Sequence, residues 1–155
     1  MRNQNDILWL ENQLCFPLYA ASRLTTKLYG PLLKTLDVTY PQYLVLLVLW
    51  EQNHQSVSAI SKLLYLESNT LTPLLKRLEQ KKLITRERSE ADERTVIISL
   101  TNYGTALKKE ALCIPSQLMA NLQDHTTTEK EIKEFSNTLL KLLTVLDQKT
   151  SKLTI

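Results

Sequence analysis

SNTLTPLLKRLEQKKLITRERSEADERTVIISLT, residues 68–101, changes its hydrophobic period half-way along. In the first half the leucines follow the i, i+3, i+4, i+7 spacing of one buried helical stripe: Leu71, Leu74, Leu75 and Leu78. The second half holds two β-rich arms, LITRER and TVIISL, around the polar centre SEADE. This pattern predicts a helix followed by a hairpin with a longer loop. We expect Ser68 or Asn69 to cap the helix and Pro73 to lie in its first turn.

Two further helices are predicted upstream of this stretch. The segment QYLVLLVLWEQ, after Tyr40 and Pro41, is apolar nearly all round, which places it in the core. The segment SVSAISKLLYL follows, and Ser56 is its predicted cap. Three helices followed by a two-stranded hairpin are the order of a winged helix-turn-helix, whose last helix before the hairpin is the recognition helix. We therefore expect a mainly α fold with a winged helix-turn-helix over about residues 40–100.

A first helix is predicted ahead of the core, from close to Cys15 to about Lys34. Its apolar residues fall near helical spacing: Leu14, Leu18, Leu24, Leu28 and Leu32. Pro17 is tolerated only in a first turn, because it lacks the N–H that a helix interior needs. Asn12 is the candidate cap.

Two helices are predicted after the hairpin. TNYGTALKKEALCIPSQLMANL is the fifth, with Pro115 breaking or kinking it, and TTTEKEIKEFSNTLLKLLTVLDQ is the sixth. The sixth carries one apolar stripe: Ile132, Phe135, Leu139, Leu142 and Leu146. With no repeat and no long linker, residues 1–155 are expected to form one domain of six helices with a two-stranded wing. Two recognition helices must be held about one DNA turn apart, so we expect a dimer through the terminal helices, about 8–36 and 101–148.

The composition excludes several classes of function. The chain has 155 residues, 43% of them hydrophobic and 23% charged, which is typical of a globular protein, and its net charge is only +3. Two glycines are too few for a phosphate-binding loop, and neither histidine lies in a ligand-like cluster, so we expect no cofactor, metal or catalytic motif. The N-terminus has no signal-peptide core, and the longest apolar run, residues 43–50, is too short to cross a bilayer. We expect a cytoplasmic protein without a membrane segment.

The predicted recognition helix and hairpin carry side chains suited to DNA. Short hydrogen-bonding residues lie where the helix would enter a groove, and cations follow where phosphates would lie: Ser68, Asn69, Thr70, Thr72, Lys76 and Arg77. Arg86 is on a hairpin arm, and Arg94 at the tip suits the negative potential of a narrow minor groove. Asp92 fits this interpretation if it orients Arg94 by a charge-assisted hydrogen bond. The alternative is an ordinary amphipathic helix with a solvated polar face, beside an exposed charged hairpin.

LENQLCFPLYAASR, residues 10–23, sets Cys15 in an aliphatic stretch two places before a proline. A helix N-terminus near Cys15 would favour the thiolate, which is the reactive form, and hydrogen bonds from phenolic hydroxyls would favour it further. No basic residue adjoins Cys15. The alternative is a small core residue, since free cysteine is among the most buried residue types. The residues alone leave both interpretations open.

Residues 68–101, with a D-x-R sequence at the hairpin tip, resemble the MarR family of dimeric winged-helix regulators. Within that family, LENQLCFPLYAASR and LDVTYPQYLVLLVLWE, residues 36–51, are similar to the OhrR type of organic hydroperoxide sensor. The resemblance implies a homodimeric repressor of double-stranded operator DNA. It further implies that an organic hydroperoxide oxidises Cys15 to a sulfenic acid, that a disulfide or mixed disulfide follows, and that the operator is then released.

The resemblance also implies roles for the tyrosines and for the second cysteine. Tyr29 and Tyr40, with Tyr19 as a third candidate, would hydrogen-bond the Cys15 thiolate. In members of this type that have two cysteines, the second cysteine forms a disulfide with the oxidised thiol of the other subunit. That resolving cysteine lies in the same part of the chain as Cys113. Cys113 is therefore a candidate resolving residue, and a buried core cysteine is the alternative.

Two other functions stay open. A MarR-type regulator that binds a phenolic or other small ligand non-covalently would keep the fold and the DNA and would make Cys15 incidental. A thiol peroxidase would need sustained turnover and a reductant partner. No second residue close in sequence resolves or activates Cys15, which argues against an enzyme.

Overall fold

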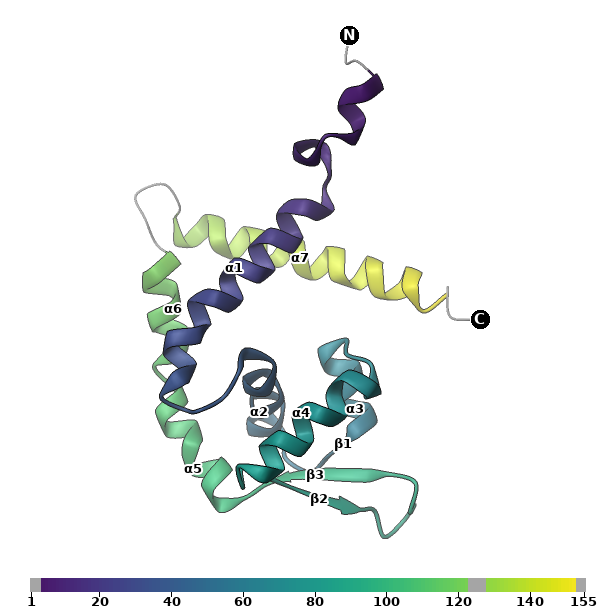
Figure 1. Ribbon diagram of the computed structural model, residues 1–155, viewed down its shortest axis with the longest axis vertical. Helices are drawn as coiled ribbons and strands as arrows, with labels where there is room; N and C mark the ends of the chain where they lie inside the picture. The colour runs from purple at the N-terminus through teal and green to yellow at the C-terminus, as the bar shows by residue number, and fades with distance from the viewer. Residues whose placement is uncertain (1–3, 123–127, 153–155) are drawn as a thin grey trace. The chain divides into compact units, whose positions relative to one another are not determined.

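The computed structural model describes residues 4–122 and 128–152, which form helices and one small sheet (Figure 1). In chain order the elements are the short 3₁₀ helices η1 (Gln4–Leu8) and η2 (Leu10–Asn12), then α1 (Cys15–Lys34), α2 (Tyr40–Glu51), β1 (Gln55–Ser56), α3 (Val57–Leu64), α4 (Ser68–Gln80), β2 (Ile84–Arg88), β3 (Val96–Leu100), α5 (Asn102–Ala111), α6 (Ile114–Leu122) and α7 (Glu129–Thr150). The mainly α, winged-helix fold predicted from the sequence is confirmed. The fifth predicted helix is present as two, α5 and α6, because the chain leaves the helix just before Pro115.

The helix-turn-helix is built by α2, α3 and α4. At the start of α2, the side-chain oxygen of Gln42 accepts a hydrogen bond from the backbone N–H of Thr39 at 2.9 Å. Ser56 caps α3 as predicted, since its hydroxyl oxygen accepts from the backbone N–H of Ala59 at 3.1 Å. Local polar side chains therefore set where both helices begin.

The core lies where α2, α3, α4 and the sheet meet. Its most deeply buried side chains include Val45, Leu46, Leu49, Ile60, Leu71, Leu75, Leu78, Ile84 and Ile98. The core position predicted for α2 is confirmed. Three of the four leucines predicted to form the α4 stripe belong to this core, whereas Leu74 is only half-buried.

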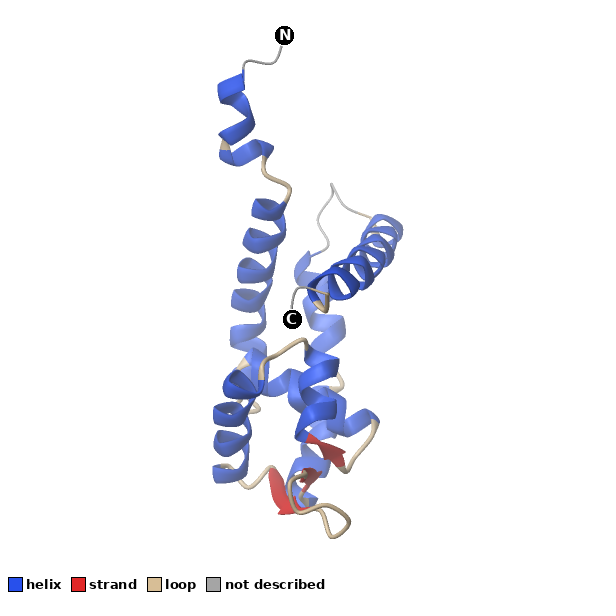
Figure 2. Ribbon diagram, turned by 90° about the vertical axis from the view of Figure 1, so that its right-hand side faces the viewer, coloured by secondary structure: helices blue, strands red, loops and turns tan. Residues whose placement is uncertain are grey.

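The sheet contains the predicted hairpin and one strand more. Ile98 of β3 pairs antiparallel with Arg86 of β2 on one side and with Gln55 of β1 on the other, so the strand order is β1-β3-β2. The expected two-stranded wing is confirmed as β2 and β3, whereas β1 was not predicted, because a strand of two residues is too short to leave an alternating pattern. Figure 2 shows the three strands together below the helices, on the side opposite the N-terminal segment.

The start of α1 differs from the prediction in its cap. The helix begins at Cys15 and ends at Lys34, as expected, but the cap position is Leu14, which offers no capping side chain. Asn12 lies in η2 instead, and its side-chain amide donates a hydrogen bond to the carbonyl of Asp6 at 2.6 Å. Asn12 therefore stabilises the segment before α1 and does not cap the helix.

The start of α4 also lies earlier than predicted. Its first residue is Ser68 and its cap position is Glu67, so neither Ser68 nor Asn69 is the cap. Pro73 consequently lies in the second turn of the helix, not the first. Its ring lacks the N–H that would bond the carbonyl of Asn69, and the buried leucines on either side of it hold the helix together.

The chain divides into two compact units, residues 1–115 and 116–155. In the second unit α7 confirms the sixth predicted helix, and the carboxylate of Glu131 accepts from the backbone N–H of Thr128 at 2.8 Å. The predicted apolar stripe of α7 is exposed or half-buried within the chain: Ile132, Phe135, Leu139, Leu142 and Leu146. Residues 123–127, inside the helical range predicted over 101–148, lie outside the described residues. In the described ranges no helix is long and apolar enough to cross a bilayer.

Gly104 marks a close approach between α5 and the chain before β2. A Cβ on Gly104 would lie 2.0 Å from the carbonyl oxygen of Leu83, whereas a Cβ on Gly30 would meet nothing within 4 Å. The indole N–H of Trp50 also donates to the Gly104 carbonyl at 2.9 Å. Gly104→Ala should therefore lower the free energy of unfolding by about 1–3 kcal/mol, because backbone atoms must move apart.

Gly30→Ala is the matched control for this prediction, since Gly30 also lies in a helix. It should leave the free energy of unfolding unchanged or raise it by about 0.5–1 kcal/mol through helix propensity. Urea unfolding followed by circular dichroism measures both variants. Equal shifts in the two would contradict the close approach at Gly104.

Candidate DNA interface and thiol site

The candidate DNA interface begins at the first turn of α4. Ser68, Asn69 and Thr70 are exposed there, at a helix N-terminus, which attracts phosphate. Thr72 is half-buried, and its hydroxyl donates to the carbonyl of Ser68 at 2.7 Å. Three of the four short polar residues predicted for this helix are therefore placed on the surface.

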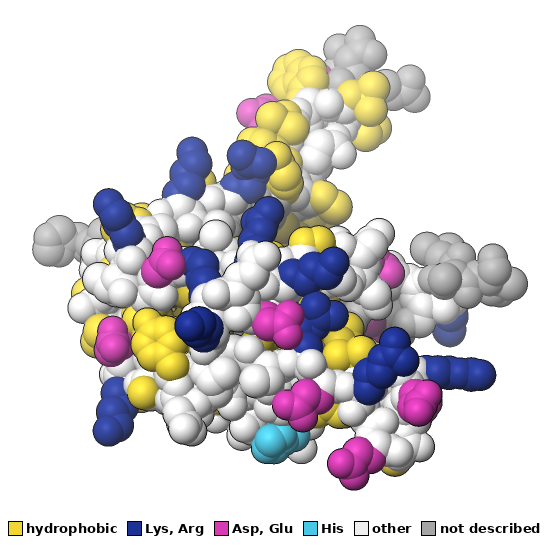
Figure 3. All heavy atoms as spheres, turned by 60° about the horizontal axis from the view of Figure 1, so that its bottom comes forward, with side chains coloured by type: hydrophobic (Ala, Val, Ile, Leu, Met, Phe, Trp, Pro, Cys, Tyr) yellow, Lys and Arg dark blue, Asp and Glu magenta, His cyan; other side chains and the backbone are white. Residues whose placement is uncertain are grey.

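Cations follow this polar turn. Lys76 and Arg77 are exposed on α4, and Arg88 and Arg94 are exposed on the wing. Figure 3, which brings the wing end forward, shows Lys and Arg side chains interspersed with Asp and Glu over this face. The pattern suits contacts with separate phosphates and offers no single block of positive charge.

Asp92 fixes the backbone of the wing tip. One of its carboxylate oxygens accepts from the backbone N–H of Arg94 at 3.0 Å, and the other accepts from the hydroxyl of Thr95 at 2.9 Å. The predicted charge-assisted hydrogen bond is present, but it holds the backbone of Arg94 and not its guanidinium. The Arg94 side chain is exposed above this fixed turn.

Arg86 differs from the other predicted DNA contacts because it faces the recognition helix. It lies on the same face of β2 as the buried Ile84, and its Nη1 is 3.6 Å from a carboxylate oxygen of Glu79 on α4. Its side chain is 23% exposed, and its Nε is buried without a hydrogen-bond partner in the part of the chain that the structure describes. A DNA contact by Arg86 stays a prediction, and its observed place is between wing and helix.

Cys15 lies at the start of α1 and is exposed. The positive end of the helix dipole is therefore at the thiol, and Leu14 before it supplies no side-chain cap that would compete for the N–H groups. The single chain does not bury the sulfur. The alternative of a small core residue is therefore wrong for Cys15 within one chain.

Tyr29, Tyr40 and Tyr43 form a cluster near the other end of α1. The ring centroids of Tyr29 and Tyr40 are 4.5 Å apart, and those of Tyr29 and Tyr43 are 6.0 Å apart. Burial, reinforced by the neighbouring phenols, raises the pKa of Tyr29 to about 12, and burial also raises the pKa of Tyr40 and of Tyr43. The three hydroxyls are therefore protonated at neutral pH and can donate hydrogen bonds.

The structure does not bring Cys15 to this cluster within one chain. Cys15 and Tyr29 lie 14 residues apart on α1 (29 − 15 = 14), which at about 1.5 Å per residue separates their Cα atoms by roughly 21 Å. Tyr19 is close to Cys15 in sequence, but its hydroxyl accepts from the guanidinium of Arg23 at 3.2 Å. Of the three predicted tyrosines, the structure groups Tyr29 with Tyr40 and leaves Tyr19 apart.

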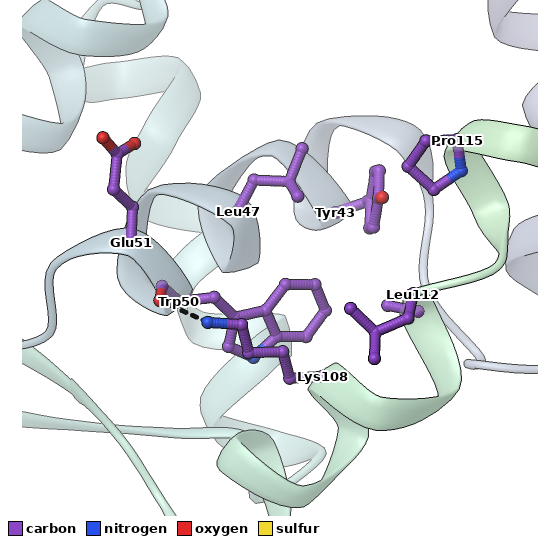
Figure 4. Close-up of a pocket in the computed structure, with 8 residues that line it drawn as sticks. Tyr43, Leu47, Trp50, Glu51, Lys108, Leu112 and Pro115 are labelled. Carbon is purple, nitrogen blue, oxygen red and sulfur yellow. Dashed lines mark hydrogen bonds between the residues drawn. The ribbon is translucent and has the colours of Figure 1, made fainter.

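A pocket that was not predicted from the sequence lies beside the tyrosine cluster. It lies between α2 and α5, has a volume of about 360 Å³ and is lined by Tyr43, Leu47, Trp50, Glu51, Lys108, Ala111, Leu112 and Pro115 (Figure 4). The rings of Tyr43 and Trp50 meet edge to face, with centroids 6.1 Å apart. The spacing of Tyr43, Leu47 and Trp50 puts them on one helical face. Because α2 is apolar nearly all round, its sequence does not indicate which face lines a pocket and which faces are buried in the core.

Cys113 lies in the turn between α5 and α6 and is exposed. Its thiol donates to the carbonyl of Glu110 at 3.4 Å, and it adds to the raised pKa of Tyr43, behind burial and Tyr40. The alternative of a buried core cysteine is therefore wrong for Cys113 within one chain. Neither cysteine is in a disulfide, and the described residues contain no cluster of His, Cys, Asp and Glu that could hold a metal ion.

A family model described as the transcriptional regulator SarA/Rot matches residues 27–111. The organic hydroperoxide resistance transcriptional regulator of Bacillus subtilis (strain 168) is 50% identical over 149 residues, which are 96% of this chain and 99% of that protein. The chain belongs to the MarR/SarA-type family of winged-helix transcriptional regulators. This family is not enzymatic, so the thiol-peroxidase alternative is set aside.

Two solved structures of AbfR extend the comparison. Reduced AbfR bound to DNA has a TM-score of 0.76 and 41% identity, over 92% of this chain and 97% of that one. The disulfide form of AbfR has a TM-score of 0.62 and 39% identity, over 93% of this chain and 97% of that one. This regulator therefore shares its fold with a protein solved both on DNA and in a disulfide form.

The buried phenols predict a loss of stability at alkaline pH. Folding raises the pKa of Tyr29 from 10.0 to about 12, so the unfolded chain gives up this proton first as the pH rises. The contribution to stability is fully present below about pH 10 and is lost as the pH rises through about 12. Tyr29→Phe should therefore flatten the fall in the free energy of unfolding over this range.

Urea unfolding at a series of pH values measures this effect. Tyr103→Phe is the control, because the Tyr103 ring is exposed, and it should keep the wild-type slope. A Tyr29→Phe protein that loses stability in parallel with the wild type would contradict the burial of this phenol.

Proposed function

We propose that this protein is a homodimeric repressor that leaves its operator DNA when an organic hydroperoxide oxidises Cys15. The observation that carries the proposal is an exposed thiol at the positive end of α1, in a chain 50% identical to a regulator named for organic hydroperoxide resistance. The AbfR structures, one reduced on DNA and one disulfide-bonded, support a regulator of this type that works through its thiols. Its partners are double-stranded DNA and a second copy of the chain, and its compartment is the cytoplasm.

The DNA side of the proposal rests on α4 and the wing. The first turn of α4 enters the major groove, and the wing tip, held by Asp92, reaches the adjacent minor groove. The exposed residues that contact base edges and phosphates are Ser68, Asn69, Thr70, Lys76, Arg77 and Arg94. Thr72 and Arg86 are half-buried, so in this proposal they support the DNA-binding surface from below and make fewer direct contacts with DNA. Arg86 holds the wing against α4 through Glu79.

The dimer side rests on apolar surface that one chain leaves exposed. The stripe of α7 and the segment around the start of α1 both expose large apolar side chains. Patches of this kind are typical of protein interfaces. We place the interface on the terminal helices, about 8–36 and 101–148, because they can hold two recognition helices about 34 Å apart, one turn of DNA.

The sensing site is shared between two chains in this proposal. Cys15 lies roughly 21 Å from Tyr29 along one helix, so the phenols that contact the thiol come from the second copy. Hydrogen bonds from Tyr29 and Tyr40 of that copy, together with the end of α1, stabilise the thiolate. The thiolate attacks the terminal oxygen of the hydroperoxide and the O–O bond breaks. Cys15 becomes a sulfenic acid, and the alkoxide takes a proton and leaves as an alcohol.

The second step converts the sulfenic acid into a disulfide. A thiol attacks the sulfur, and water leaves with the oxygen. Cys113 of the second copy is the thiol that we propose, and a small cellular thiol is the alternative. The two Cα atoms must come within about 7 Å, and the break in the helix at Cys113 is where the backbone can adjust.

A second candidate function is regulation by a small phenolic ligand. The pocket between α2 and α5 favours it, since its volume is about 360 Å³ and its walls are mostly apolar. In that case Cys15 is incidental to the response. A thiol-blocking reagent separates the two functions, because it abolishes the response only if the thiol is the sensor.

Arg94→Ala should weaken operator binding by about 1–3 kcal/mol if Arg94 makes a specific groove contact. Lys76→Ala should weaken binding to all DNA sequences and reduce the dependence of affinity on salt, because a phosphate contact is lost. Fluorescence anisotropy with operator and scrambled duplexes at several salt concentrations measures both. Lys133→Ala, on α7, is the control. Unchanged affinity in both DNA-face variants would exclude the proposed interface.

Cys15→Ser should bind the operator like the wild type but no longer release it on treatment with cumene hydroperoxide. Tyr29→Phe and Tyr40→Phe should each slow release by roughly tenfold, because the thiolate loses a charge-assisted hydrogen bond. Stopped-flow anisotropy measures the release rates, with Tyr103→Phe as the control. Release that survives in Cys15→Ser would place the sensor elsewhere.

Oxidised wild-type protein should run as a covalent dimer on a non-reducing gel if Cys113 resolves Cys15 across the dimer. Cys113→Ser should abolish that band and leave Cys15 oxidisable, which intact mass spectrometry of the treated protein detects. A wild type that stays at the monomer mass after full oxidation of Cys15 would exclude Cys113 as the resolving thiol and leave a small cellular thiol as the candidate.

A further inference from the structure

We infer that the pocket between α2 and α5 is closed in the dimer by the N-terminal apolar segment, residues 7–16, of the second chain. The inference rests on the proposed sensing site that two chains share. Beyond that site, the inference names the segment that covers the pocket, and it places the residues before Cys15 against the second chain.

The N-terminal apolar segment is folded but buries little of its own surface. Its exposed large side chains are Ile7, Leu8, Trp9, Leu10, Leu14 and Phe16. Side-chain amides hold its two short helices together, since Asn12 donates to the carbonyl of Asp6 and Gln13 donates to the carbonyl of Ile7, both at 2.6 Å. A prefolded, apolar and partly aromatic surface of this kind is typical of an interface.

The pocket offers a matching surface on the same unit of the chain. Figure 4 shows Tyr43, Leu47 and Trp50 of α2 on one side and Leu112 and Pro115 on the other. At its rim the ammonium of Lys108 donates to the carbonyl of Trp50 at 2.9 Å. Glu11 is the only charged residue among residues 7–16, and the charged residues that line the pocket are Lys108 and Glu51, one of each sign, so the match between the two surfaces rests on their apolar side chains.

The segment cannot reach the pocket of its own chain. It precedes α1, whereas α2 follows it, and α1 has 20 residues, which at about 1.5 Å each give a length of roughly 30 Å. Figure 1 shows the N-terminal segment and α2 at opposite ends of α1. The occupant of the pocket is therefore the segment of another copy.

The register follows from the shared sensing site. If Cys15 of one chain lies at Tyr40 of the other, then Leu47 is seven residues further along α2 (47 − 40 = 7), or about 10 Å. Leu10 lies five residues before Cys15 (15 − 10 = 5), in a segment with 3₁₀ turns that rise about 2 Å per residue, or roughly 10 Å. The two spans agree, and they place Leu10 and its neighbour Trp9 over Leu47.

Cysteine cross-linking tests this contact directly. The parent protein is Cys15→Ser/Cys113→Ser, into which Leu10→Cys and Leu47→Cys are introduced. Both leucines are exposed in the single chain, at 59% and 40%, so neither change removes a core side chain. Mild copper–phenanthroline oxidation should convert most of the protein to a band of twice the monomer mass on a non-reducing gel, and dithiothreitol should reverse it.

The controls are the two single variants and the pair Leu10→Cys/Leu63→Cys, since Leu63 is an exposed leucine on α3, outside the pocket. All three should stay at the monomer mass. Sedimentation and operator binding of the parent protein report the proposed function separately. A dimeric, operator-binding parent whose Leu10–Leu47 pair cross-links no better than the controls overturns the contact alone. A monomeric parent overturns both the contact and the proposed function.

Discussion

One helix of 20 residues sets the layout of this regulator. α1 carries the thiol at its first residue and Tyr29 roughly 21 Å further on. No rotation of a side chain closes that distance, so the phenols can meet the thiol only where two chains come together. In this account the dimer is needed for sensing as well as for the spacing of the two DNA-reading units, and the interface is part of the sensor.

α2 links the sensing side to the DNA-binding side. Tyr40 and Tyr43 at its start pack with Tyr29 of α1, and its buried face shares one core with α3 and α4. A second link joins the end of α4 to the connection before α2, where Lys81 forms an ion pair with Asp37 at 2.8 Å. A change at the phenols therefore acts on an element that packs directly against the recognition helix. Packed interfaces of this kind switch between discrete arrangements and do not deform gradually.

The sequence predicted the features whose signal is local. The order of helices and hairpin, the Ser56 cap and the break before Pro115 follow from periodicity, capping and proline chemistry over a few residues. The third strand was missed because its pairing with β3 is long-range, and Asn12 failed as a cap because its amide bonds the preceding turn instead. The place of Tyr43 beside the pocket could not be predicted, because it depends on how α5 packs against α2. The proposed contact between the thiol and the phenols of a second chain could not be predicted either, because no pattern within one sequence shows which residues face each other across a dimer.

A mixed dimer tests the shared sensing site most directly. One chain carries Cys15→Ser, the other carries Tyr29→Phe and Tyr40→Phe, and two different affinity tags allow the mixed dimer to be purified. If the thiol of one chain uses the phenols of the other, the mixed dimer keeps one complete site. It should then release operator DNA on treatment with cumene hydroperoxide at the wild-type rate per site, while both parent homodimers are slow or inert. Release as slow as that of the doubly substituted tyrosine homodimer would contradict a site shared between chains.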